Sequence, residues 1–305
     1  MPTPGPSTSC GSACRANSWP ASPTTRASFR SADRRAPTRQ HRQESIMGKL
    51  DGKVVLITGC SSGLGKQQAI RMAAEGASLA ICARNAEKLA ETTRLCEEQG
   101  AEVLAMTVDI MEYDSLVAFI DATVDRFGTI DVLVNNAHTI TIPAPFLEKT
   151  IDDLDLEMRS SVYAYWHLMK LCFPHLRDKE GAGASIINFA SEAAIAGDEF
   201  YAPYAASKEA VRGLSRVVAR EWGQYNIRVN TLCPNGLTEN ASGGLTSLSP
   251  EARAHVQKAF VANPFRRAGN PYDDVAPVVV FLASDDSHWI TGQNIHADGG
   301  ALINA

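Results

Sequence analysis

Residues 53–65 read KVVLITGCSSGLG, an apolar run followed at once by a turn that holds three glycines. The run at 54–57 has no polar alternation and is rich in Val and Ile, as is typical of a strand covered on both faces in a parallel sheet. Helix formers with apolar residues at helical spacing follow over residues 66–74. The stretch therefore predicts a strand, a glycine turn and a helix in direct succession.

The glycines of this turn indicate an anion site. Such a turn bends sharply and presents backbone N–H groups, and the N-terminus of the following helix adds partial positive charge. Gly59, Gly63 and Gly65 therefore favour a cradle for a dinucleotide diphosphate. Because turns use glycine everywhere, the pattern taken alone also fits an ordinary structural turn.

Strand and helix patterns alternate along the rest of the chain. Further strands are expected at about 77–83, 102–108, 131–134, 184–190, 227–233 and 294–297. Helices are expected at about 86–99, 113–127, 150–177, 203–225 and 273–283, with a short one opening near 249–251. This rhythm predicts right-handed crossovers and a doubly wound sheet. The predicted fold class is α/β: one Rossmann-type domain with a central parallel sheet of about seven strands flanked by helices.

The first 46 residues differ in composition from the rest. They are rich in Ser, Pro, Thr and Ala, lack periodicity, and carry seven arginines against two acidic residues. Such a segment buries too little apolar surface to offset its ordering entropy, so we expect 1–46 to be a disordered extension and 47–305 to be the folded domain. Two interpretations stay open, an organellar transit peptide and a translation start placed upstream of the natural one at Met47.

Composition excludes several classes of partner. The extension carries a net charge of +5, which leaves −10 on residues 47–305 and argues against nucleic acid or an anionic membrane. No apolar run approaches the roughly 18 residues needed to cross a bilayer. The seven cysteines are scattered and form no metal-ligand spacing, so we expect a reducing compartment and no metal site. We expect a cytoplasmic protein, or an organellar matrix protein if 1–46 is a transit peptide.

Polar residues mark the carboxyl ends of the predicted strands, where open α/β sheets bind their ligands. Asp109, Asn135, Ser191 and Pro234 all stand at such ends. Further along the chain, the segment YAASK at 204–208 puts a tyrosine and a lysine four residues apart, on one helix face. The sequence thus predicts a cluster of polar side chains at one edge of the sheet.

These motifs together resemble the short-chain dehydrogenase/reductase family. They are the glycine turn, the NNA segment at 135–137, Ser191, the Tyr204 and Lys208 pair, and the segments at 291–293 and 298–300. They occur in the family's order and span about residues 50–302. The resemblance implies an NAD(P)-dependent oxidoreductase that transfers a hydride between nicotinamide and a secondary alcohol or ketone.

The resemblance also implies roles for four catalytic residues. Tyr204 is the general acid/base, and Ser191 holds the substrate oxygen. Lys208 lowers the pKa of the Tyr204 phenol by electrostatic attraction and hydrogen-bonds the nicotinamide ribose. Ser161 stands where the family has an Asn, and its shorter hydroxyl is expected to hold a relay water.

Cofactor contacts are likewise carried over from the family. They are Gly59, Ser61, Ser62, Gly63, Leu64, Gly65, Arg84, Asp109, Ile110, Asn136, Ala137, Tyr204, Lys208, Pro234 and Leu237. NAD-preferring relatives have an acidic residue where this chain has Ala83, and Arg84 can pair with a 2′-phosphate. We therefore favour NADP over NAD, although Ser62 replaces a second basic residue of many NADP-dependent relatives.

Three positions depart from the family's pattern. His138 replaces the Gly of Asn-Asn-Ala-Gly, Ser161 replaces the Asn, and Asn235 replaces the Gly after Pro234. These changes leave open a catalytically weak, cofactor-binding regulatory or scaffold protein of the same fold. A nucleotide- or methyl-donor-binding Rossmann enzyme is a further alternative, but such an enzyme has no need for the Tyr and Lys at this spacing.

Substrate and oligomer predictions are coarser. Glu199, Phe200 and Tyr201, the 140–146 loop and a flap at 235–248 predict a mostly apolar pocket for a secondary alcohol or ketone of moderate size. The family resemblance implies a homotetramer or homodimer built on the helices near 151–178 and 203–225. Tyr163, Tyr165 and Trp166 serve either that interface or the core.

Overall fold

The computed structural model describes residues 48–238 and 250–303 of the chain. Its contacts divide the chain into Met1–Ser45 and Ile46–Ala305, and the fold below is that of the second unit. The extension expected at 1–46 and most of the flap expected at 235–248 lie outside the described residues.

A seven-stranded sheet forms the centre of the unit, and all its neighbouring strands are parallel. The strands are β1 (Val54–Thr58), β2 (Ser78–Ala83), β3 (Val103–Thr107), β4 (Val132–Asn135), β5 (Ala184–Phe189), β6 (Ile227–Pro234) and β7 (Asn294–Ala297). Their order is β3-β2-β1-β4-β5-β6-β7, which confirms the doubly wound fold predicted from the sequence. The strand order reverses between β1 and β4, where such sheets form a ligand crevice.

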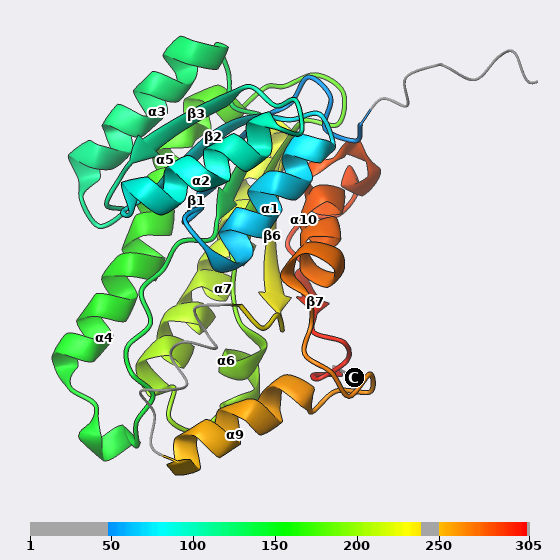
Figure 1. Ribbon diagram of the computed structural model, residues 1–305. Coiled ribbons are helices and arrows are strands. Elements are labelled where there is room, and N and C mark those ends of the chain that lie inside the picture. Colours follow the sequence, from blue (N-terminus) through cyan, green and yellow to red (C-terminus); the bar gives the residue numbers. More distant parts are fainter. Residues whose placement is uncertain (1–47, 239–249, 304–305) are drawn as a thin grey trace, which may run out of the picture. The chain divides into compact units, whose positions relative to one another are not determined.

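Helices cover both faces of the sheet (Figure 1). The α-helices are α1 (Gly63–Ala74), α2 (Ala86–Glu97), α3 (Tyr113–Phe127), α4 (Ile151–Met158), α5 (Ala164–Leu176), α6 (Glu192–Ala196), α7 (Ala202–Trp222), α9 (Pro250–Val261) and α10 (Ala276–Ala283). Side chains from α1, α2 and α10 meet Val55 and Ile57 in one core. Side chains from α3, α5 and α7 meet Leu56 in the other. Successive β1 residues therefore point into opposite cores, which is why the strand is apolar throughout.

The long helix predicted at 150–177 is present but interrupted. Thr150 caps α4 through a reciprocal capping box with Asp153. A π-helical turn, η2 (Arg159–Tyr163), then joins α4 to α5. A similar π turn, η5 (Pro271–Val275), precedes α10. Single π turns of this kind frequently occur at functional sites, and η2 holds Ser161.

Short 3-10 turns complete the described elements: η1 (Phe146–Glu148), η3 (Gly223–Tyr225) and η6 (Asp285–Ser287). Neither these turns nor the short helix α6 was expected from the sequence. None of the described helices is both long and apolar enough to cross a membrane.

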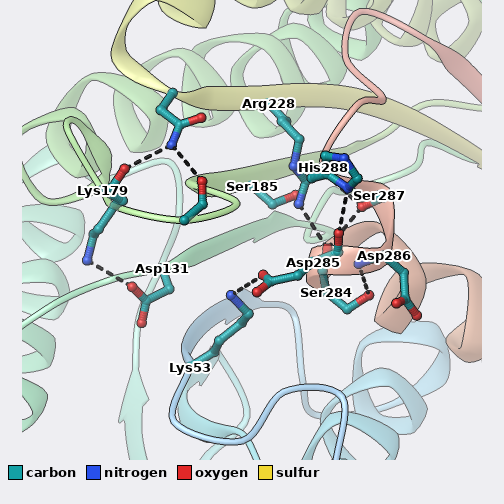
Figure 2. Close-up of polar contacts among 12 residues, drawn as sticks. Lys53, Asp131, Lys179, Ser185, Arg228, Ser284, Asp285, Asp286, Ser287 and His288 are labelled. Carbon is teal, nitrogen blue, oxygen red and sulfur yellow. Dashed lines mark hydrogen bonds and ion pairs between the residues drawn. The ribbon is translucent and has the colours of Figure 1, made fainter.

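A hydrogen-bond network closes the amino edge of the sheet (Figure 2). Arg228, near the start of β6, is buried and donates through Nη1 to Leu282 O and Ser287 Oγ at 3.0 and 2.8 Å. Its Nη2 donates to Ser284 O at 3.2 Å. These acceptors lie at the C-terminal end of α10, where the helix dipole favours a cation. The network fixes α10 to the sheet at the edge opposite the crevice.

Candidate active site

One crevice of about 720 Å³ lies at the carboxyl edge of the sheet. The segments that follow β1, β2, β3, β4, β5 and β6 all contribute to its walls. Most predicted contacts line it: Gly59, Ser61, Ser62, Gly63, Leu64, Gly65, Arg84, Asp109, Ile110, Asn136, Ala137, Ser191, Tyr204 and Pro234. The structure therefore brings these sequence-predicted residues together around one space.

The glycine turn fits closely against the segment after β4. Gly59 has φ +81°, and a Cβ there would lie 2.9 Å from Asn136 Nδ2 and from Ala137 Cα. A Cβ on Gly65 would lie 2.3 Å from Gly59 O. Neither position admits a side chain, because the backbone of the turn and the start of α1 approach too closely.

The start of α1 suits the diphosphate of a nicotinamide cofactor. The N-terminal N–H groups of a helix have no partners within the helix, and the first turn of α1 carries no acidic side chain. Ser61, Ser62, Gly63 and Leu64 line the crevice at this point. The residues present therefore fit a bound dinucleotide, and they would hold its diphosphate.

Arg84 and Asp109 line the far end of the crevice, beyond β2 and β3. The Arg84 side chain is exposed, and no described residue forms an ion pair with it. Asp109 Oδ1 accepts a hydrogen bond from the Met111 N–H at 3.0 Å, so Asp109 also stabilises its own turn. The adenosine half of a dinucleotide would lie at this end.

Tyr204 and Lys208 lie on one face of α7, as the four-residue spacing predicted. Tyr204 lines the crevice together with Ser191, which is 7% exposed and acts to lower the pKa of the Tyr204 phenol. Lys208 lies beneath it, fully buried, with Nζ 5.7 Å from the centre of the Tyr204 ring. Lys208 Nζ donates to Phe189 O at 2.9 Å. The carboxyl end of β5 thus holds the ammonium and, through Ser191, the phenol.

Burial dominates the protonation of this pair. It raises the pKa of Tyr204 well above its ordinary value, and the hydrogen bond with Ser191 offsets only part of the rise. Burial also lowers the pKa of Lys208 to about 7. Desolvation therefore sets the direction of the Tyr204 shift, and the lowering of the phenol pKa by Lys208 stays a prediction. At neutral pH the phenol is protonated and ready to act as an acid.

The three departures from the family pattern have different surroundings. The His138 ring lies 5.6 Å from the Tyr204 ring, centre to centre, and lines the crevice. Asn235 Nδ2 donates to Glu192 Oε1 at 3.2 Å. Ser161 is fully buried outside the crevice lining, and its Oγ has no hydrogen-bond partner among the described residues.

Two of the predicted cofactor contacts, Leu237 and Lys208, do not line the crevice. The Leu237 N–H donates to Gly269 O at 3.0 Å beside the Gly236 and Gly269 bridge. That N–H is therefore already engaged within the protein. Its role in cofactor binding stays a prediction.

Sequence reasoning missed three carboxylates around the site. Glu192 and Asp198 line the crevice, and burial, with Asp198 and Asp298 nearby, raises the pKa of Glu192 to about 7. Glu157 is fully buried on α4. The position of Glu192 directly after Ser191 was a usable signal. Glu157 had none, since a Glu in an amphipathic helix is ordinarily exposed.

No group of three or more His, Cys, Asp or Glu residues able to hold a metal ion occurs in 48–238 or 250–303. The five cysteines in these ranges are buried and free.

Comparison with known proteins identifies the fold and the crevice together. A family model described as Enoyl-(Acyl carrier protein) reductase matches residues 59–301. The chain is also 37% identical over 261 residues to the 12alpha-hydroxysteroid dehydrogenase of Clostridium sp., covering 83% of this chain and 98% of that protein. The chain belongs to the short-chain dehydrogenase/reductase family. It is an NAD(P)-dependent oxidoreductase that acts on an alcohol/ketone pair.

Solved structures of short-chain dehydrogenases/reductases agree with this assignment. Levodione reductase superposes with a TM-score of 0.77 at 32% identity, covering 82% of this chain and 98% of that one. A 7 alpha-hydroxysteroid dehydrogenase in complex with NADH and 7-oxo glycochenodeoxycholic acid gives 0.74 at 33% identity, covering 82% and 94%. A nicotinamide cofactor is therefore part of the activity.

Proposed function

We propose that this short-chain dehydrogenase/reductase interconverts a secondary alcohol and a ketone of moderate size, with Tyr204 as the general acid/base. The observation that carries the proposal is the position of the Tyr204 side chain, which lines the crevice together with Ser191 and has its ring 5.7 Å from Nζ of the buried Lys208. A bound nicotinamide supplies or accepts the hydride at the reacting carbon. The chain's own residues must then hold the substrate oxygen and move its proton.

Each of these side chains has a role that follows from its functional group. Ser191 and Tyr204 both offer a hydroxyl to one substrate oxygen, which fixes the carbonyl carbon for attack. In reduction Tyr204 donates its proton to that oxygen, and in oxidation it accepts one. Lys208 retains N–H donors beyond the one used by Phe189 O, and these would hold the ribose of the cofactor.

Size and polarity of the crevice favour an alicyclic or similarly bulky substrate. Ile140, Ile142 and Pro143 line one side of it and Phe260 another, so much of the contact is apolar. Relatives named for hydroxysteroids and levodione support a ring-bearing alcohol or ketone.

To test the proposal, the purified protein is mixed with reduced nicotinamide cofactor and each of a panel of cyclic ketones. Oxidation of the cofactor is measured as the loss of its near-ultraviolet absorbance. Tyr204→Phe is expected to lower kcat by about 10³-fold while cofactor affinity, measured by fluorescence titration, stays unchanged. Tyr113→Phe, which makes the same change at an exposed tyrosine at the start of α3, is the matched control. Cofactor binding without turnover of any ketone or alcohol would instead favour a regulatory protein of this fold.

We further propose that the enzyme prefers NADP. Ala83 brings no carboxylate to the end of β2, and the exposed Arg84 beside it can pair with a 2′-phosphate. The expected kcat/KM is higher for NADPH than for NADH. Arg84→Ala should lower the NADPH value by about tenfold or more and leave the NADH value unchanged. Equal loss with both cofactors would contradict the preference.

A homodimer or homotetramer is proposed from the exposed faces of two helices. Tyr163 and Trp166, at the junction of η2 and α5, are 56% and 49% exposed, and Val217 on α7 is 53% exposed. Tyr165 is buried and belongs to the interior instead. Size-exclusion chromatography with light scattering tests this: a dimer or tetramer is expected, and Trp166→Glu should shift it toward monomer.

A further inference from the structure

Three buried polar atoms on the long helix have no hydrogen-bond partner among the described residues. They are Glu157 Oε2, Ser161 Oγ and Tyr165 Oη, on residues that are all fully buried. The residues are four apart, so they follow one side of the α4, η2 and α5 helix. Because buried polar groups are almost always paired with protein or ordered water, these atoms indicate a small wet space.

This side of the helix faces the catalytic lysine. The segments α4 and η2 pack against α7, which carries Lys208 and Tyr204. Lys208 Nζ lies 5.4 Å from the centre of the Tyr165 ring, and the Glu157 carboxylate raises the proton affinity of Lys208. Since Lys208 Nζ gives one of its three hydrogens to Phe189 O, it keeps donors for water on this side.

The other carboxylate oxygen of Glu157, Oε1, is hydrogen-bonded to residues nearer the surface. Thr141 donates to Glu157 Oε1 through its N–H at 2.6 Å and through its hydroxyl at 3.2 Å. The Thr141 hydroxyl accepts from Lys149 Nζ at 2.8 Å. Thr141 and Lys149 are half-buried, and Thr141 lines the crevice. The hydrogen-bond directions run from Lys149 to Thr141 to Glu157, as inward delivery of a proton requires.

We propose that Glu157 is a proton-relay residue that connects Lys208, through water held by Ser161 and Tyr165, to the surface at Thr141 and Lys149. The inference rests on the proposed role of Tyr204. In this proposal the buried Glu157 carboxylate takes the relay role of the family's Asn, which Ser161 replaces in this chain. Glu157 touches neither substrate nor cofactor, so it acts through Lys208.

Every proton that a ketone reduction consumes can be supplied along this relay. The Tyr204 O–H bond breaks as the substrate O–H bond forms, and the carbon takes hydride from reduced nicotinamide. Tyr204 regains a proton from Lys208, water returns one to Lys208, and the Glu157 carboxyl returns one to that water. Solvent then restores the Glu157 proton through Thr141. Oxidation of the alcohol reverses every transfer.

Charges around Glu157 suit this exchange. Lys208 faces it from α7 and Lys149 from the residues before α4, and both act against the burial that raises the pKa of Glu157. The phenols of Tyr165 and Tyr204, whose rings both lie within about 6 Å of Lys208 Nζ, are titratable groups on the same packed side. Burial raises the pKa of Glu157 and lowers the pKa of Lys208, so it brings the proton affinities of the acid and the amine closer together.

Glu157→Gln tests the proposal, because the amide keeps an oxygen for Thr141 and loses the exchangeable proton. In ketone reduction kcat should fall by about tenfold at pH 8 and by less at pH 6, since the missing relay matters most where protons are scarce. KM should stay the same, and the solvent deuterium isotope effect on kcat should rise. Asp155→Asn, an exposed carboxylate on the same helix, should change none of these.

Two further variants keep the test decisive if Glu157→Gln fails to fold. Glu157→Asp should restore most of kcat, and Tyr165→Phe, which keeps the packing, should lower kcat severalfold with the same pH dependence. Unchanged pH profiles and isotope effects in these variants overturn the relay, even if the midpoint of thermal unfolding falls. Loss of the proposed function looks different: turnover then survives in Tyr204→Phe, or is absent from the wild type.

Discussion

Arg228 and Lys208 are both buried basic side chains, but they lie at opposite edges of the sheet. Arg228 uses two nitrogens for three hydrogen bonds to the end of α10 and to Ser287, and among its nitrogens only Nε has no described partner (Figure 2). Lys208 makes one hydrogen bond, to Phe189 O. The amino edge thus satisfies its buried charge with protein groups, whereas the carboxyl edge leaves donors free. We infer that the first cation stabilises the fold and the second serves chemistry.

Replacing Lys208 tests the carboxyl edge and should have the largest effect on activity. Lys208→Met is expected to lower kcat by at least about 10²-fold, because it removes the ammonium that serves Tyr204. Thermal stability should stay equal or rise slightly, since an apolar side chain of similar length replaces a poorly paired buried charge. Steady-state kinetics and thermal unfolding of the same preparation measure both. A variant that unfolds early but retains kcat would contradict the comparison.

Replacing Arg228 tests the amino edge and should have the largest effect on stability. Arg228→Met leaves Leu282 O, Ser284 O and Ser287 Oγ without their donor, at a cost of roughly 2–4 kcal/mol in the free energy of unfolding. Denaturant titration measures that loss. The kcat of the folded fraction should be unchanged, so a kcat deficit at full folding would show that the two edges are coupled.

Glu192, at the carboxyl edge of the sheet, should make the stability of the protein depend on pH. Its pKa is raised to about 7 in the folded protein, against an ordinary 4.5, so the folded state binds more protons than the unfolded state between these values. Stability should therefore fall as pH rises from about 5 to 8. Glu192→Gln should remove roughly 1–2 kcal/mol of this decline, discounted because the side chain is partly solvated. Parallel unfolding curves against pH for both proteins would refute the assignment.

The smallest effect is expected at an exposed pair of the amino edge. Lys53 Nζ lies 2.6 Å from Asp285 Oδ1, but the Asp285 side chain is 65% exposed (Figure 2). Lys53→Met should change the free energy of unfolding by at most about 0.5 kcal/mol, because water screens such pairs. Chemical denaturation at low and moderate salt measures it. A loss comparable to that of Arg228→Met would mean that the amino edge depends on surface charge.

The sequence was sufficient for the sheet and for most of the crevice because both follow from local patterns. The buried apolar run at 54–57 and the helix pattern at 113–127, which ends at Gly128, define elements that the structure reproduces almost residue for residue. The four-residue spacing of Tyr204 and Lys208 gave their shared face. A sequence pattern is enough to predict the position of a side chain when its neighbours are close in sequence or follow from the strand order.

What the sequence left out depends on tertiary contacts. The π turn at 159–163 has no local signature, because the same residues suit an uninterrupted α-helix. Burial of Glu157 depends on α7, which lies about 50 residues later in the chain. The direction of the Tyr204 pKa shift also depends on tertiary contacts, because desolvation follows from the whole packed environment and not from the spacing of Tyr204 and Lys208.

The junction of β1 and β4 has a consequence for how the protein matures. Val54 N–H donates to Asp131 Oδ2 at 2.9 Å across a separation of 77 residues, whereas β1, β2 and β3 pair through much shorter loops. During synthesis the first three strands can associate before the junction exists, since closing the longer loop costs more entropy. The crevice is complete only after strands β4 to β7 pair with the part of the sheet that β1, β2 and β3 form. A nicotinamide nucleotide would thus bind only the finished chain, and its presence during refolding would raise the yield by mass action.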